Sequence, residues 1–291
     1  MSGPAAPAQA TSEPPPAFVG AGIATAPGPA PSRRRLVRVA LPAASFVVVL
    51  AAWQILSSTG LVNPLFISSP YDIVRTGAEQ LRLHTFWQDL AVSGSEFGIG
   101  YAIALAIAVP FGLVTGWYRR LSYFFDPWLN AFNSIPRLAL LPLIVLWVGL
   151  GVSSKVVVVL IGAFFPIAVN TFYGVRTVDR RLLQVATCFH ASQPQTFLTV
   201  VGPATVPFIF TGARIGVGRA TAGVVVGEFY TATEGIAYRM FQAGSQLRTD
   251  LVLFYALVIA ALSMAMFALA GWLERRVASW RTGATGGGRL R

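Results

Sequence analysis

Apolar residues dominate six segments of the chain, and short polar stretches separate these segments. They lie at about Leu36–Ser57, 90–117, 122–149, 155–175, 206–229 and 250–273. A helix rises about 1.5 Å per residue, so about 20 residues cross the ~30 Å hydrocarbon core of a bilayer. The pattern therefore predicts an all-α, polytopic membrane protein with six transmembrane helices.

Glycines recur at short spacing within two of these segments. They are Gly94, Gly98 and Gly100 in the second segment, and Gly212, Gly216 and Gly218 in the fifth. Small residues three or four positions apart let helix backbones approach closely within a membrane. We therefore expect tight helix packing along both segments.

The composition agrees with a membrane protein and argues against several other classes. Hydrophobic residues make up 55% of the chain and charged residues only 11%, whereas soluble domains carry about 25% charged residues. The formal net charge is +11, but no basic stripe with interleaved aromatic residues indicates nucleic-acid binding. The single cysteine, Cys188, excludes an intrachain disulfide, and the isolated His84 and His190 do not indicate a metal site.

Three regions follow from the distribution of apolar residues. Residues 1–32 are rich in Pro, Ala and Gly, and we expect a disordered cytoplasmic tail because they lack the apolar content needed to fold. Residues 33–281 form the predicted transmembrane domain, and residues 282–291 a flexible cytoplasmic tail.

The arginine clusters predict the orientation in the membrane. With six spans and the N-terminus inside, the inside segments hold fourteen Lys and Arg residues and the outside segments five. Cytoplasmic loops beside membrane spans carry such an excess of basic residues. We therefore expect both termini on the cytoplasmic side of a bacterial cell membrane.

A loop between the fourth and fifth spans, about 176–206, is too long for a simple connection in a compact bundle. Leu182, Leu183, Ala186 and Phe189 recur there at helical spacing, and a second short helix is expected from about Gln193 to Val201, before Pro203. Two short amphipathic helices of this kind are suited to docking in a partner's groove.

This loop resembles the cytoplasmic loop of the permeases of binding-protein-dependent ABC importers. The family pattern is Glu-Ala-Ala, three residues, Gly, nine residues, Ile, one residue, Leu-Pro. Ala186 and Pro203 match this pattern, Val185 and Val200 are conservative replacements, and Gln184, His190 and Gly202 depart from it. Ala191 and Ser192 follow the glycine position as in the family. A histidine at the glycine position is compatible with a left-handed turn, which histidine tolerates better than most residues do.

The resemblance extends over about residues 36–281 and is to the nitrate, sulfonate and taurine branch. It includes NPLFISSP at 63–70, FDPWLNAFNSIPRLALLPLIVLWVGLGVSSK at 125–155, FFPIAVNTFYGVRTVD at 164–179 and VVVGEFYTATEGI at 224–236. Several such phrases in the same order are more specific than one degenerate loop motif.

The resemblance implies a transport subunit and no enzyme. It implies two cytoplasmic ATPase subunits, an external substrate-binding protein and a second copy of this chain as partners. The loop would seat in the ATPase, with Ala186 on the face that docks. No phosphate-binding loop of the form Gly-x-x-x-x-Gly-Lys-Ser/Thr is present. We therefore expect no cofactor on this chain, and ATP and Mg²⁺ on the partner ATPase.

Polar residues within the predicted spans are candidates for the translocation path, since such residues are costly in lipid and usually face a cavity or a partner. The candidates are Asn133, Arg137, Asn170 and Glu228. Arg137 follows Pro136, and its fixed charge suits an anion. Arg214 and Arg219 project about 140° apart on an ideal helix, so both cannot face one path equally.

The solute and the energy source remain open at this point. Similar permeases carry nitrate, sulfonates and taurine, or alternatively aromatic acids and thiamine pyrimidine precursors. An ion-coupled secondary transporter is a further alternative, but such proteins often contain inverted repeats, and none is evident here. A membrane-embedded enzyme would require clustered His, Asp or Glu residues in the spans.

The orientation is testable by labelling single cysteines in intact cells. Cysteines at positions 60–88 and 235–248 should react with an impermeant reagent from outside, and those at 182–200 only from inside. Labelling of 235–248 from the inside alone would refute the six-span arrangement.

Overall fold

The computed structural model describes residues 31–59, 66–135, 137–231 and 233–277, and leaves out the side chains at 31–39, 43, 133, 134, 137 and 138. Every regular element in these ranges is helical. Most of the two predicted tails lies outside them. Pro31 and Ser32, which were assigned to the first tail, instead begin a helix.

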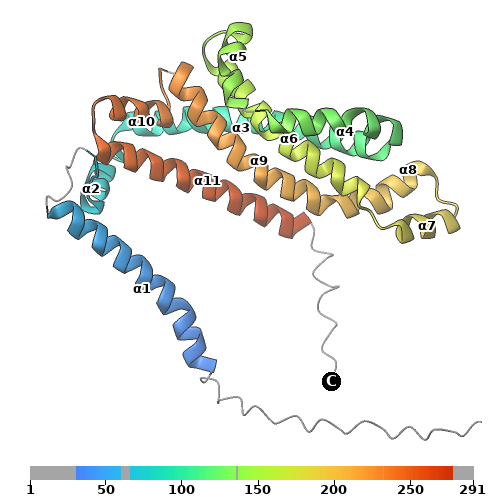
Figure 1. The fold of residues 1–291 in the computed structure, drawn as a ribbon, viewed down its shortest axis with the longest axis horizontal. Coiled ribbons are helices and arrows are strands. Elements are labelled where there is room, and N and C mark those ends of the chain that lie inside the picture. Colours follow the sequence, from blue (N-terminus) through green and yellow to red (C-terminus); the bar gives the residue numbers. More distant parts are fainter. Residues whose placement is uncertain (1–30, 60–65, 136, 232, 278–291) are drawn as a thin grey trace, which may run out of the picture. The chain divides into compact units, whose positions relative to one another are not determined.

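The helices follow one another with short connections (Figure 1). They are α1 (Pro31–Ser58), α2 (Pro70–Gln80), α3 (His84–Trp117), α4 (Arg119–Ser134), the 3₁₀ turn η1 (Arg137–Leu140), α5 (Leu141–Val148), α6 (Val152–Arg176), α7 (Arg180–Cys188), α8 (Gln193–Thr196), the π-helical turn η2 (Phe197–Val201), α9 (Gly202–Thr231), α10 (Ile236–Ser245) and α11 (Thr249–Val277).

Within the described ranges, five helices are long and apolar enough to cross a membrane. They are the Ala40–Ser58 part of α1, α3, α6, the continuous helix Gln193–Thr231, and α11. The all-α, multi-span prediction is therefore confirmed. The sixth predicted span, 122–149, is not one helix but is divided into α4, η1 and α5. Ile135 has extended backbone angles at this break, because the proline that follows it disfavours the helical conformation.

The centre of the bundle is α6, which packs along both α3 and α9 (Figure 1). Alanines fill the contact, among them Ala108 on α3, Ala163 on α6 and Ala220 on α9, all completely buried. A Cβ added at Gly100 would lie 2.8 Å from the carbonyl oxygen of Val156, so this glycine sets the distance between α3 and α6. Small side chains therefore let α3, α6 and α9 pack closely together.

The predicted role of the six glycines is confirmed at three positions. Besides Gly100, Gly212 and Gly216 lie close against α6. Gly94 and Gly98 have no neighbouring atom within 4 Å of an added Cβ, and Gly218 approaches only a phenylalanine ring, at 3.7 Å. The last three do not mediate close packing in the single chain, since they lie on other sides of α3 and α9.

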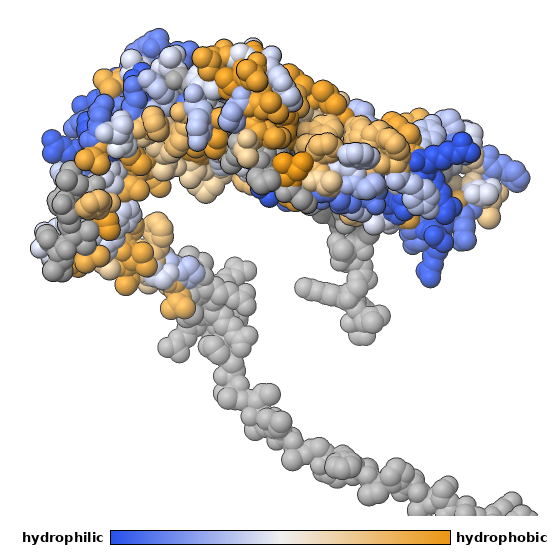
Figure 2. All heavy atoms as spheres, turned by 45° about the horizontal axis from the view of Figure 1, so that its top comes forward, coloured by the Kyte–Doolittle hydropathy of each residue, from blue (hydrophilic) through white to orange (hydrophobic). Residues whose placement is uncertain are grey.

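The surface of the region from α2 to α11 is polar at its ends and apolar between them (Figure 2). Leu257 and Met264 on α11 are 58% and 65% exposed. Exposed apolar side chains are costly in water and are favourable in lipid, so this band is the expected lipid-facing surface.

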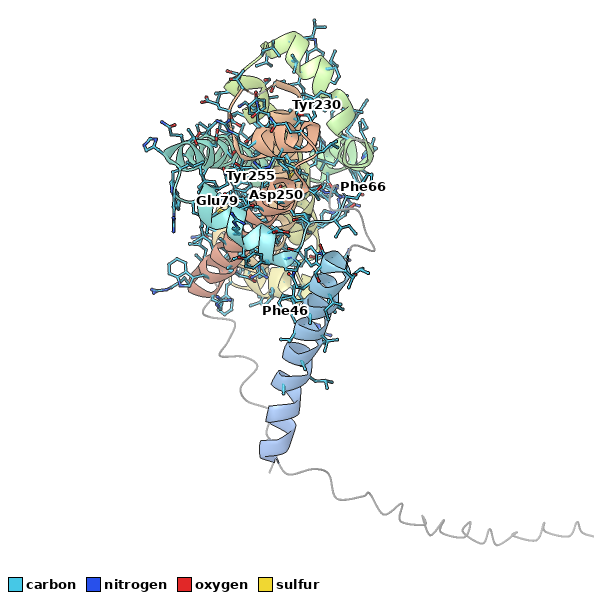
Figure 3. The ribbon with its side chains drawn as sticks, turned by 90° about the vertical axis from the view of Figure 1, so that its left-hand side faces the viewer. Phe46, Phe66, Glu79, Tyr230, Asp250 and Tyr255 are labelled. Carbon is cyan, nitrogen blue, oxygen red and sulfur yellow. The ribbon has the colours of Figure 1, made fainter. Side chains whose placement is uncertain are left out.

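Two groups of short helices lie at opposite ends of the long helices (Figure 1). One end carries α7 and α8, and the other carries α2 and α10. At the second end, Thr76 of α2 donates a hydrogen bond to Asp250 of α11 (2.9 Å), and Tyr255 donates one to Gln80 (2.9 Å). Asp250 and Tyr255 are labelled in Figure 3. These bonds attach α2 to α11.

Residues up to Ala51 belong to a separate unit of the chain. Within it, the described side chains of α1 are exposed or nearly so, and Phe46 is 67% exposed (Figure 3). An exposed apolar helix of this length agrees with the first predicted span.

Candidate functional site

The connection between α7 and α8 is a tight, well-defined turn. The amide of Ala191 donates to the carbonyl of Ala186 (3.0 Å), and the amide of His190 donates to that of Thr187 (2.9 Å). This pair of bonds ends a helix with a residue in the left-handed conformation. His190 holds that position with φ 53°, so the expected left-handed turn at this histidine is confirmed.

The next helix begins with a capping box. The Ser192 hydroxyl accepts a bond from the amide of Gln195 (3.4 Å), and the Gln195 side chain accepts one from the amide of Ser192 (2.8 Å). Both contacts satisfy amides that have no partner within the helix. The sequence around the turn thus fixes where α7 ends and α8 begins.

The second short helix of the loop does not end at Pro203, contrary to the expectation. Helical structure continues from Gln193 through η2 into α9, and forms one helix up to Thr231. The amide of Gly202 bonds to the carbonyl of Phe197 across the wider π turn. Proline at position 203 lacks an amide hydrogen, and the π turn just before it accommodates this loss without breaking the helix.

α7 exposes an apolar stripe among polar residues, and Ala186 does not lie on it. Leu182, Val185 and Phe189 are 49%, 53% and 80% exposed, whereas Ala186 is only 7% exposed. In the single chain Ala186 is therefore not on the exposed side of α7, where the expectation placed it, and its docking against a partner stays a prediction. Its small side chain lies on the inner face of α7, which packs against η2.

The other residues of the predicted loop surround this turn. Those with exposed side chains are Gln184, His190, Ser192 and Pro203, and those of intermediate exposure are Ala191, Val200 and Gly202. Leu198 is 70% exposed on η2. Together, Leu182, Val185, Phe189 and Leu198 define an apolar loop surface.

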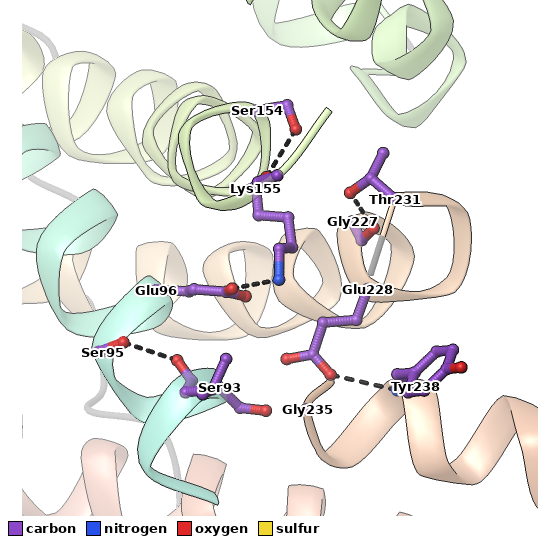
Figure 4. A network of polar contacts seen from close by, with 12 residues as sticks. Ser93, Ser95, Glu96, Ser154, Lys155, Gly227, Glu228, Thr231, Gly235 and Tyr238 are labelled. Carbon is purple, nitrogen blue, oxygen red and sulfur yellow. Dashed lines mark hydrogen bonds and ion pairs between the residues drawn. The ribbon is translucent and has the colours of Figure 1, made fainter. Parts of the chain in front are cut away.

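At the other end of the bundle, two carboxylates and a lysine are buried together (Figure 4). Glu96 of α3 and Glu228 of α9 are completely buried, and Lys155 of α6 is 3% exposed. Lys155 forms an ion pair with Glu96. Burying a charge without a partner is strongly unfavourable, so this pair ties α3 and α6 together.

The partners of Glu228 are backbone amides of α10. Its Oε2 atom accepts hydrogen bonds from the amides of Ala237 (2.8 Å) and Tyr238 (3.2 Å) at the start of α10 (Figure 4). A negative charge at a helix N-terminus is stabilising, because the first amides there have no helical partner.

Two residues of α3 complete this capping. Asp89 accepts a bond from the Gly235 amide (2.9 Å), and the Ser93 hydroxyl accepts one from the Ile236 amide (2.9 Å). Asp89 also accepts a bond from Arg239 (2.7 Å), and this bond raises the pKa of the Arg239 guanidinium. Four successive amides, 235–238, are therefore held by α3 and α9, which fixes α10 on the bundle.

The contacts of the predicted path residues differ. Glu228 is buried in the single chain and caps α10. Asn170 is half-buried, and its side-chain amide donates to the carbonyl of Pro166 (2.8 Å) within α6. The side chains of Asn133 and Arg137 lie outside the described residues. Sequence reasoning missed Asp89, Ser93 and Lys155, although a lysine beside an apolar segment was a usable signal.

Comparison with known proteins identifies the architecture. Residues 108–279 match the family of binding-protein-dependent transport system inner membrane components. A probable ABC transporter permease protein of Brucella abortus is 35% identical over 249 residues, covering 85% of this chain and 98% of that protein.

Other relatives carry a stated solute in their names. The taurine transport system permease protein TauC of Escherichia coli is 30% identical over 84% of this chain and 90% of its own length. The putative aliphatic sulfonates transport permease protein SsuC of Bacillus subtilis is 30% identical over 82% and 87%. The inward-facing MetNI methionine ABC transporter shares the fold, with a TM-score of 0.51 and 19% identity over 72% of this chain and 97% of that one.

The capping of α10 can be tested at Gly235. This glycine has φ 119°, and an added Cβ would collide with the Glu228 carboxylate. Gly235→Ala should therefore destabilise the protein by about 1–3 kcal/mol, the usual cost of backbone strain, and lower the thermal unfolding midpoint of the purified protein.

Gly244→Ala is the matched control on the same helix. An added Cβ there meets only Val252, at 3.8 Å, and no positive φ is required. The control should leave the midpoint unchanged or raise it. Equal midpoints for Gly235→Ala and the wild type would contradict the packing described for this cap.

Proposed function

Because the chain belongs to the family of binding-protein-dependent transport system inner membrane components and is the permease subunit of an ABC importer, we propose that it forms the path for a small organic or inorganic anion. Sulfonates, including taurine, are the favoured class. The support is that TauC and SsuC, named for taurine and aliphatic sulfonates, align with more than four-fifths of this chain. Nitrate belongs to the same class of small oxyanions.

The proposed assembly contains two copies of this chain, two cytoplasmic ATPase subunits and one external binding protein. A second copy of the same chain is the default for a two-fold path. The ATPases would bind ATP and Mg²⁺, and this chain would bind neither. Both termini would lie in the cytoplasm, on the side of α7 and α8.

The observation that carries the coupling role is the apolar loop surface of Leu182, Val185, Phe189 and Leu198. Arg180 and Arg181 lie beside it at the start of α7 and are exposed. An apolar surface next to charged residues, at the end of a helix that continues into a membrane span, suits a soluble partner. Movement of that partner would be transmitted to α9 directly, because the helix is continuous from Gln193 to Thr231.

The solute class can be tested on the partner binding protein. Titration calorimetry with taurine, ethanesulfonate and nitrate should give micromolar or tighter affinity for at least one of them. Uptake by the complete transporter should show the same order of preference. Tight binding of a solute that has no anionic group, with no affinity for taurine, ethanesulfonate or nitrate, would refute the proposed solute class.

The coupling role can be tested at Phe189. Its side chain is 80% exposed, so Phe189→Glu should leave the fold of this chain intact and place a charge in the interface. Burying an unpaired charge costs several kcal/mol, and each 1.4 kcal/mol is about tenfold in affinity. We therefore expect at least about a hundredfold weaker ATPase binding, measured by co-purification, with normal membrane abundance and no uptake.

Gln184→Glu is the control for the added charge. Gln184 is exposed on the same helix, and glutamate is the residue that the family pattern has there, so transport should continue. Ala186→Glu is unsuitable for this purpose, because it would disrupt the packing of α7 inside the loop. If the Phe189→Glu variant kept its ATPase bound and showed wild-type uptake, the proposed coupling role of this surface would be contradicted.

A further inference from the structure

Arg219 differs from Lys155 and Arg214, two other described cations of the long helices. Lys155 pairs with Glu96, and Arg214 on α9 pairs with Glu274 on α11. Arg219 is exposed, and no acidic side chain forms an ion pair with it within the part of the chain that the structure describes. Its charge therefore has no acidic counter-ion among the described residues.

Arg219 lies far from both ends of α9. At about 1.5 Å per residue, it lies about 18 Å from the end of α9 at Thr231 and about 25 Å from its start at Gly202. An arginine side chain is too short to reach water at either end from this depth. A charge facing lipid at such a depth is costly, so this face of α9 must meet water or protein.

The neighbouring exposed residues leave room beside the guanidinium. Thr211, Ile215, Gly218 and Ala222 share the exposed side of α9 with Arg219. Gly218 and Ala222 are small, so a solute could approach the helix closely there. The backbone of Arg219 packs tightly against α6. A Cβ added at Gly162 of α6 would lie only 3.0 Å from the carbonyl oxygen of Arg219.

We propose that Arg219 lines the solute path at the junction of two copies of this chain and binds the anionic group of the solute. A guanidinium offers several N–H donors in a fixed plane, which suits the oxygens of a sulfonate, carboxylate or nitrate. This proposal rests on the proposed importer function and deepens it, since it assigns the recognition of charge within the membrane to one residue.

The placement of Arg219 is tested by thiol labelling of the complete transporter in lipid nanodiscs, where both faces are accessible. In a Cys188→Ser background, Arg219→Cys should react with 2-sulfonatoethyl methanethiosulfonate at least about tenfold faster than Met264→Cys. Met264 is 65% exposed on α11 and serves as the lipid-facing control. Equally slow labelling of both variants would overturn the placement of Arg219 in an aqueous path.

The recognition of charge is tested by uptake of labelled taurine. Arg219→Gln should lower uptake at least about tenfold, and Arg219→Lys should retain most of it, with ATPase co-purification unchanged in both. Unchanged uptake with Arg219→Gln would overturn the role in anion binding. Absence of taurine uptake in the wild type would count against the proposed solute, while the labelling result would still decide where Arg219 lies.

Discussion

The absence of water from the hydrocarbon core governs which polar residues this chain can place in its long helices. Each such group must find a partner inside the protein or face an aqueous path. Glu96 and Lys155 meet this constraint with an ion pair, and Glu228 meets it by capping α10. Arg214 does so through Glu274. The same constraint separates structural from functional residues, because Arg219 is exposed and no described acid pairs with it.

The capping of α10 and the loop of α7 and α8 lie at opposite ends of the same helix. α9 begins as a continuation of the loop and ends near Glu228, which holds the first amides of α10. A shift of the loop end would therefore move Glu228 and α10 with it, unless the π turn at Phe197–Val201 absorbs the motion. Wider helical turns often occur at functional sites, and this one lies where the loop meets the span.

The sequence predicted the long helices well, because apolar length alone determines whether a segment can span a bilayer. It also predicted the left-handed turn at His190, a local property of the backbone. At 122–149 it predicted one span, whereas the structure divides this segment into α4, η1 and α5. It did not predict the burial of Ala186 and Glu228, since a motif or a residue type gives a position along the chain but not the side of the helix that is buried. That choice depends on contacts with helices distant in the sequence.

The proposed two-fold pair would place two copies of the exposed Arg219 near one another. In a symmetric dimer each Arg219 has an equivalent residue on the other copy, so two like charges would line one path. Like charges repel most strongly where little water screens them, and an anion between them would relieve this repulsion. A solute of the same size without an anionic group would offer no such relief. The arrangement would therefore favour anions within the membrane, in addition to any selection by the external binding protein.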